Sequence, residues 1–307
     1  MEVIRLVFLD VVLPILLLMT LGMFLQKKFD FHLRTITKLI TYCFMPAAVF
    51  LNISQSAFDY QLIGQLFLYL LLFMSSLMLL GTGLAKLLKL ETPERAALKN
   101  SISLMNAGNY GLPISQLIFS ANPLGVSIQI FIIVIQNILT YSYGLYNLMS
   151  ASKSILSILK ALVRLPIIHA LILGLIFQIF DVPLPNFALI PLEQLADAFM
   201  ALALFLLGAQ LANIKLKTFH QVIVWSLLGR LFVSPAIALV FIYVLGIDGV
   251  MAQSLLIASA LPTSRNTATL ALEHRVAPEL HAQVVLYSTL VSSITVTVVI
   301  YVSMVLF

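Results

Sequence analysis

The sequence is short of charge. Lysine and arginine account for 17 of its 307 residues and aspartate and glutamate for 12, so only 9% of the side chains are charged. A soluble globular domain usually has about 25%. Hydrophobic residues make up 61% of the chain, and the mean hydropathy is +1.08. This composition predicts an integral membrane protein with the lipid bilayer as its surroundings.

Cysteine and enzyme motifs are also scarce. Cys43 is the only cysteine, which excludes an intramolecular disulfide and a cysteine-based metal cluster. The sequence has no His-Glu-x-x-His, no Gly-x-Ser-x-Gly and no Gly-x-x-x-x-Gly-Lys-Ser/Thr loop. We therefore expect no enzyme, no metal, no cofactor and no use of ATP by the chain itself.

What the sequence does contain is a series of long apolar segments. A helix needs about 20 apolar residues to cross the hydrocarbon layer of a membrane. On this measure we predict ten membrane-spanning helices, at residues 4–25, 36–54, 62–88, 96–119, 124–149, 165–181, 190–213, 219–245, 250–272 and 281–306.

The few positive charges alternate along the connections between these segments. The first, third, fifth, seventh and ninth connections contain lysine or arginine, whereas the even-numbered ones, at 52–61, 120–125, 181–191 and 246–249, contain neither. Positive residues favour the cytoplasmic side. We therefore expect a multi-pass protein of the cell (cytoplasmic) membrane with both termini on the outer face. The formal net charge of +5 is explained by this topology, so we expect no nucleic-acid partner.

An odd number of spans in each half makes the two halves insert with opposite orientation. Residues 1–150 and 151–307 would each hold five spans, which predicts an all-α fold of two inverted five-helix repeats. No connection is long enough to hold a separate soluble domain.

Two of the predicted spans contain residues that interrupt a helix. Gly108, Gly111 and Pro113 lie close together in the fourth, and Pro262 lies in the ninth, about 150 residues downstream. Broken backbone inside a membrane is tolerated only where protein or a water-filled cavity surrounds it. Paired interruptions in two halves indicate the binding site of a secondary transporter. The polar candidates around them are Asn106, Asn109, Tyr110, Thr263, Ser264, Arg265 and Asn266.

Arg265 is the most informative of these residues. A charge in the middle of a span costs about 2.5–3.5 kcal/mol on insertion scales and usually marks a functional site. Its guanidinium has the planar set of donors that suits a carboxylate. Arg265 either binds an anionic substrate or pairs permanently with an internal acid, for which Asp10 and Asp197 are the candidates.

Four further polar residues have open roles. Asp10 and Asp197 are either proton or ion-pair sites or are solvated near the outer surface. Arg230, in the eighth span, either forms an ion pair, extends to the membrane surface, or belongs to the site. Asn137 in the fifth span either faces the first break or contacts another helix.

Five motifs in order resemble those of the auxin efflux carrier family, which includes plant auxin exporters and bacterial carriers of malate or malonate type. The clearest are Asn106-x-Gly108-x-x-Gly111-x-Pro113 and Ala260-Leu261-Pro262-Thr263-Ser264-Arg265-Asn266. The others are Tyr42-x-x-x-Pro46-Ala47, the stretch from Leu202 to Ala209, and Arg230-Leu-Phe-x-x-Pro235-Ala236. Together they cover nearly the whole chain. Arg265 stands where bacterial relatives commonly have a small residue.

The resemblance implies a ten-span carrier in which the fourth and ninth helices cross. Spans 1, 2, 6 and 7 would form a scaffold, with a homodimer through it, and spans 3–5 and 8–10 a transport domain that moves like an elevator. Substrate would bind at the crossing.

From the residues and the resemblance together, we expect a secondary active transporter or facilitator of small organic anions, either auxin-like or dicarboxylate. Two alternatives remain: a sodium- or proton-coupled carrier of another solute on the same fold, and a membrane sensor that transports nothing.

Overall fold

The computed structural model describes residues 8–55, 60–148, 163–214 and 220–307, and within these ranges regular structure is helical, with one isolated bridge of extended backbone. Segments labelled η are short π-helical turns. The first half contains η1 (Phe8–Val12), α2 (Leu13–Phe29), α3 (Leu33–Leu39), η2 (Ile40–Phe44), α4 (Met45–Ser54), α5 (Tyr60–Leu87), α6 (Thr92–Ser103), η3 (Ala107–Gly111), α7 (Leu112–Ile118), α8 (Pro123–Leu139), η4 (Thr140–Gly144) and α9 (Leu145–Leu148). The second half contains α11 (Pro166–Ile179), α12 (Asn186–Leu211), α13 (Gln221–Leu227), η5 (Leu228–Val233), α14 (Ser234–Val244), α15 (Gly249–Ser259), α16 (Arg265–His274) and α17 (Pro278–Leu306).

The prediction of an all-helical membrane protein is confirmed. Seven helices of the described residues are long and apolar enough to cross a membrane: Phe8–Phe29, Leu33–Ser54, Ile63–Leu87, Pro123–Leu148, Asn186–Leu211, Gln221–Val244 and Pro278–Leu306. Pro166–Ile179 and Gly249–Ser259 are apolar but shorter. Eight of the nine agree with a predicted span to within a few residues at each end, and Gly249–Ser259 covers only the first half of the predicted span 250–272. The arrangement as ten spans in two inverted repeats stays a prediction.

The fourth and ninth predicted spans are interrupted where the sequence places glycine and proline. In the fourth, α6 ends at Ser103 and α7 begins at Leu112, with Pro113 in its first turn. In the ninth, α15 ends at Ser259 and α16 begins at Arg265. Proline is accepted in a first turn because the amide it lacks has no partner inside the helix.

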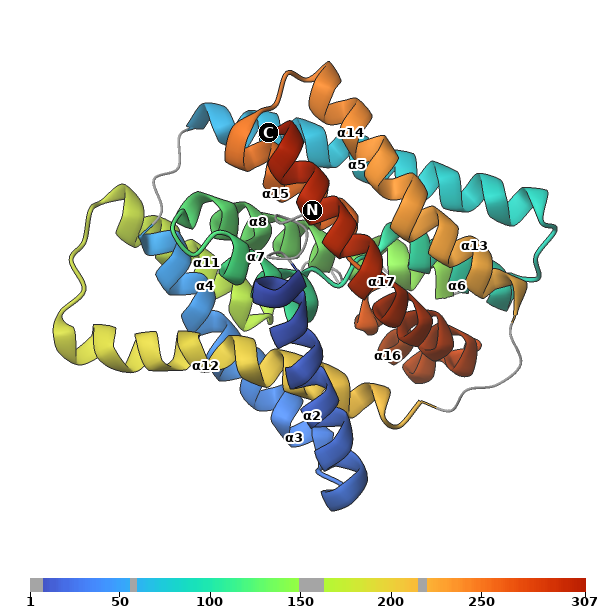
Figure 1. Ribbon diagram of the computed structural model, residues 1–307, viewed down its shortest axis with the longest axis horizontal. Helices are drawn as coiled ribbons and strands as arrows, with labels where there is room; N and C mark the ends of the chain where they lie inside the picture. The colour runs from blue at the N-terminus through green and yellow to red at the C-terminus, as the bar shows by residue number, and fades with distance from the viewer. Residues whose placement is uncertain (1–7, 56–59, 149–162, 215–219) are drawn as a thin grey trace.

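The helices pack in two sets that meet around α7 and α8 (Figure 1). In the first set, α12 packs against α2 and α4, and α4 against α11. In the second, α6 packs against α5 and α13, and α15 against α14 and α17. In Figure 1 the first set lies toward the lower left and the second toward the upper right. The crossing of the two interrupted spans lies within this assembly and positions the site described below.

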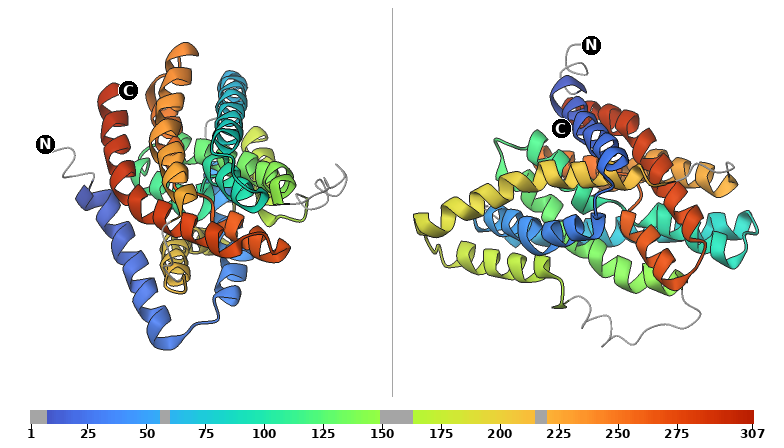
Figure 2. Two further views of the ribbon diagram at one scale, coloured as in Figure 1. Left: turned by 90° about the vertical axis from the view of Figure 1, so that its right-hand side faces the viewer. Right: turned by 90° about the horizontal axis from the view of Figure 1, so that it is seen from below.

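Helices α2 and α12 touch backbone to backbone where they cross, as the right-hand view of Figure 2 shows. A Cβ atom built at Gly208 would lie 1.9 Å from the carbonyl oxygen of Met19, and one at Gly22 would lie 2.0 Å from that of Phe205. Only glycine leaves room for so close an approach. The two glycines therefore fix how near these helices come.

Candidate functional site

The two interrupted segments are joined to each other through their backbones. The amide of Asn106 donates to the carbonyl of Pro262 at 2.8 Å, and the amide of Ser264 donates to the carbonyl of Leu104 at 2.8 Å. Met105 and Thr263 form an antiparallel bridge between these two bonds. The breaks thus supply one another with the hydrogen bonds that a continuous helix would have made internally.

Side chains from neighbouring helices satisfy further backbone groups freed by the breaks. The amide of Met105 donates to Gln136 Oε1 at 3.1 Å, and the amide of Thr263 donates to Ser288 Oγ at 3.1 Å. Thr263 Oγ1 in turn donates to the carbonyl of Ser101 at 3.1 Å. The extended backbone at the crossing is therefore held rigidly from α8 and α17, and no water is needed to satisfy these groups.

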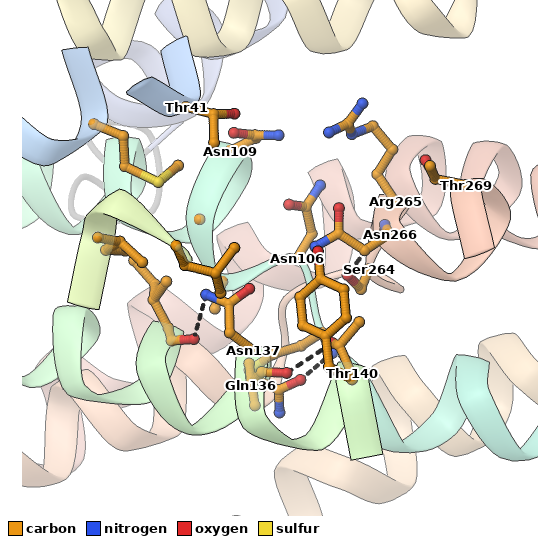
Figure 3. A pocket seen from close by; sticks show the side chains of 18 of the residues that line it. Thr41, Asn106, Asn109, Gln136, Asn137, Thr140, Ser264, Arg265, Asn266 and Thr269 are labelled. Atoms are coloured by element: carbon orange, nitrogen blue, oxygen red, sulfur yellow. Dashed lines mark hydrogen bonds between the residues drawn. The ribbon is translucent and has the colours of Figure 1, made fainter. Parts of the chain in front are cut away.

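A cavity of about 280 Å³ adjoins this bridge (Figure 3). Polar side chains from several parts of the chain line it: Thr37, Thr41, Asn106, Asn109, Gln136, Asn137, Thr140, Tyr141, Ser264, Arg265, Asn266 and Thr269. Both second half-helices begin at it, since Asn106 directly precedes η3 and Ser264 accepts a hydrogen bond from the Asn266 amide as the N-cap of α16. Helix N-termini expose amide donors and carry a partial positive charge, which favours anions.

Among the residues that the structure describes, Arg265 is the only charged one that lines this cavity. Its Nε atom is buried without a hydrogen-bond partner, and no carboxylate of the described residues lies within ion-pair distance of its guanidinium. Asp10 and Asp197 are both exposed and neither is paired with it. Figure 3 shows the side chain extended away from α16, toward the side of the cavity that carries Asn109 and Thr41. The structure therefore gives no support to a permanent ion pair.

Asn106 supplies a second donor without a partner. Its side chain is only 5% exposed, and its Nδ2 atom has no hydrogen bond within the protein. A buried amide nitrogen in this state costs about 1–3 kcal/mol in lost hydrogen bonding. Figure 3 shows Asn106 beside Asn266 and below Arg265. The cavity is therefore lined by two hydrogen-bond donors that have no acceptor, Asn106 Nδ2 and Arg265 Nε. Its described lining residues include no aspartate or glutamate.

The structure divides the predicted site residues into two groups. Those that line the cavity are Asn106, Gly108, Asn109, Asn137, Ser264, Arg265 and Asn266. Those that lie behind it are Tyr110, Gly111, Pro113, Pro262 and Thr263. The hydroxyl of Tyr110 accepts a hydrogen bond from Ser292 Oγ at 3.3 Å, and a Cβ atom at Gly111 would lie 2.4 Å from Gln129 Nε2. This second group shapes the breaks and makes no contact with the cavity.

Arg230 follows none of the ion-pair or surface roles that the sequence suggested for it. The side chain is completely buried, so it does not extend to a membrane surface, and no carboxylate of the described chain lies within ion-pair distance. It donates instead to the backbone carbonyls of Ile102 and Ser259. Asp197 lines a separate cavity together with Glu193, and Asp10 lies in η1; neither lines the cavity at the crossing.

Sequence reasoning missed several residues of the cavity wall. Thr37, Thr41 and Met45 line it from the second span, at the four-residue spacing of one helix face. Thr140 and Tyr141 follow Asn137 by about one turn along the fifth span. This spacing is a signal that sequence analysis can use once one residue of each face is known.

The fold and the cavity together define a class of protein. Polar cavities at the crossing of two interrupted membrane helices are the binding sites of secondary transporters. Residues 7–300 match the family described as membrane transport protein, and the chain belongs to this family, which confirms the resemblance to the auxin efflux carriers. It is also similar to an uncharacterized transporter of Methanocaldococcus jannaschii, with 29% identity over 275 residues, or 85% of this chain and 87% of the relative. Both comparisons indicate a transporter.

Proposed function

We propose that this transporter carries small organic anions, mono- or dicarboxylates, and binds them in the cavity at the crossing. The observation that carries the proposal is the guanidinium of Arg265, which has no ion-pair partner among the described residues and lies in a cavity whose described lining has no carboxylate. Asn106 Nδ2 adds a second unpartnered donor, and two helix N-termini add partial positive charge. A bound carboxylate would supply hydrogen-bond acceptors for these donors.

We propose further that the chain crosses the cell membrane ten times as two inverted repeats, with both termini outside. The interruptions support this repeat because α7 and α16 begin at comparable places in the two halves. The helix packing supports an elevator mechanism, since α2, α4, α11 and α12 contact one another as a scaffold would. A homodimer would form through that scaffold.

We also infer the conformational state of the transporter from the position of the cavity. Thr37 and Leu165 line the cavity. Thr37 lies near the start of the second predicted span, three residues after Arg34 of the first connection, and Leu165 directly follows Arg164 of the fifth. Those connections face the cytoplasm in the proposed topology. With that topology we infer an inward-facing state, in which substrate would exchange between the cavity and the cytoplasm.

Substitution of Arg265 tests the anion site. Hydrogen bonds to a charged group contribute about 1.5–3 kcal/mol, so Arg265→Ala should weaken anion binding by roughly 10- to 150-fold. Arg265→Lys keeps the charge but loses the two-pronged geometry, and we expect an intermediate affinity. Isothermal titration calorimetry on purified protein with malate, malonate and indole-3-acetate would give the dissociation constants.

The matched control is Arg34→Ala, which also removes one positive charge but from an exposed position outside the cavity. It should bind anions as the wild type does. The thermal stability of each variant must be measured alongside. We expect Arg265→Ala to stay folded, because no acid of the described residues pairs with Arg265 and would be left alone. A stable Arg265→Ala protein with unchanged affinity for every anion that the wild type binds would refute the proposed site.

A further inference from the structure

Arg230 lies at the C-terminal ends of the helices that lead into the crossing, whereas the cavity lies at the N-terminal ends of the helices that leave it. Its side chain is completely buried, and its Nη1 atom donates to the carbonyl of Ile102 at 2.9 Å. Its Nη2 atom donates to the carbonyl of Ser259 and, at 2.8 Å, to Ser234 Oγ. Ile102 belongs to the last turn of α6 and Ser259 is the last residue of α15. One guanidinium therefore binds the C-terminal ends of both first half-helices.

The charge of this guanidinium is balanced without an acid. No aspartate or glutamate of the described chain lies within 4.0 Å of it. A helix C-terminus carries a partial charge of about −0.5, so the two ends that meet here supply roughly one negative charge between them. Burying an isolated cation would be very costly, and the partial negative charge of these two helix ends offsets that cost.

The local structure of the eighth span brings Arg230 to this place. It lies in η5, a π-helical turn, and such turns often occur at functional positions. The preceding residue, Gly229, allows the helix to approach closely, since a Cβ atom there would lie 2.8 Å from Ile102 Cδ1. One turn earlier, Ser226 Oγ and Ser101 Oγ are 2.6 Å apart and share a hydrogen bond. The eighth span is thus fixed against the end of α6.

We propose that Arg230 is a built-in cation that takes the place of a bound sodium ion at the crossing. In transporters with broken helices, unwound carbonyls and C-terminal helix ends coordinate the coupling cation. Here the carbonyls of Ile102 and Ser259 are already occupied by the protein's own guanidinium. This carrier therefore needs no sodium ion at the crossing, either for stability or for ligand binding. The inference concerns the cation side of the crossing and does not depend on which solute the cavity binds.

The first test uses the wild-type protein. Its melting temperature in detergent should be the same in sodium, potassium and choline chloride at equal ionic strength. A melting temperature raised specifically by sodium would overturn the proposal, because it would show a sodium site that Arg230 has not replaced. No substrate is present in this measurement, so its outcome is separate from that of the anion-site test.

The second test removes the charge. Arg230→Met keeps an unbranched apolar stem but leaves two helix ends without a cation, and its melting temperature should fall by roughly 6–20 °C. Arg230→Lys should recover part of this loss. Guanidinium chloride at millimolar concentration should raise the melting temperature of Arg230→Met, because its cation has the size of the head group removed, and choline chloride should not.

The control is Arg34→Met, an exposed position whose variant should melt as the wild type does and respond to neither salt. If Arg230→Met cannot be purified folded while Arg230→Lys can, the requirement for charge is supported. An Arg230→Met protein as stable as the wild type would overturn the proposal, and so would an Arg230→Lys protein no more stable than Arg230→Met. A purely steric role would not respond to the added cation.

Discussion

The contact between α2 and α12 gives a prediction whose size follows from the structure. In Gly208→Ala the new methyl group would lie 1.9 Å from the carbonyl oxygen of Met19, whereas real Cβ atoms essentially never approach another atom within 3.0 Å. The obstacle is backbone and not a flexible side chain, so the two helices must move apart by more than an ångström. Overpacking of this kind costs about 1–3 kcal/mol. We expect the melting temperature of the purified protein to fall by several degrees.

Gly83→Ala is the matched control. Gly83 also lies within a helix, but a Cβ atom there would meet nothing within 4 Å. Alanine is favoured over glycine inside a helix by roughly 0.5–1 kcal/mol, so this variant should melt at the wild-type temperature or slightly above it. Fluorescence-monitored thermal unfolding in one detergent compares the two directly. A Gly208→Ala protein as stable as Gly83→Ala would show that α2 and α12 do not touch as described.

Two further predictions concern topology and the support of the break. On a Cys43→Ala background, single cysteines in the connection at 181–191 should react with an impermeant thiol reagent added outside intact cells, and those at 86–99 should not; the reverse pattern would invert the proposed orientation. Gln136→Leu should lower the free energy of unfolding by about 1–3 kcal/mol, because the buried amide of Met105 loses its acceptor, and denaturant titration of the purified protein would detect this; unchanged stability would contradict the assignment.

The sequence predicts the interruptions well because their causes are local. Gly108, Gly111 and Pro113 disfavour a continuous helix wherever the segment lies, and the structure interrupts the helix there. Arg265 was predictable as a site residue for a similar reason: a charged residue in the middle of a membrane span is rare and can be recognised without knowing its neighbours. It lines the cavity, as does Asn106.

The other parts of the site depend on contacts that no local pattern encodes. Thr41 and Tyr141 are ordinary residues of apolar spans, and only the packing of the second and fifth spans brings them to the cavity. Tyr110 has the chemistry of a site residue, but the helix turns it toward Ser292. Two of the partners of Arg230 are backbone carbonyls, one more than a hundred residues before it and one about thirty after it, and every residue type has a backbone carbonyl.

The backbone pairing of the two breaks has a consequence for how the protein is made. Asn106 is synthesised long before Pro262, whose carbonyl its amide requires. At a translation rate of about 5–20 residues per second, that delay is roughly 8 to 30 s. During this delay the amide of Asn106 in the fourth span lacks its final acceptor. An unsatisfied backbone group costs several kcal/mol in hydrocarbon. The first half of the chain therefore cannot reach its final form alone, because its interrupted span is completed only after the ninth span has been made.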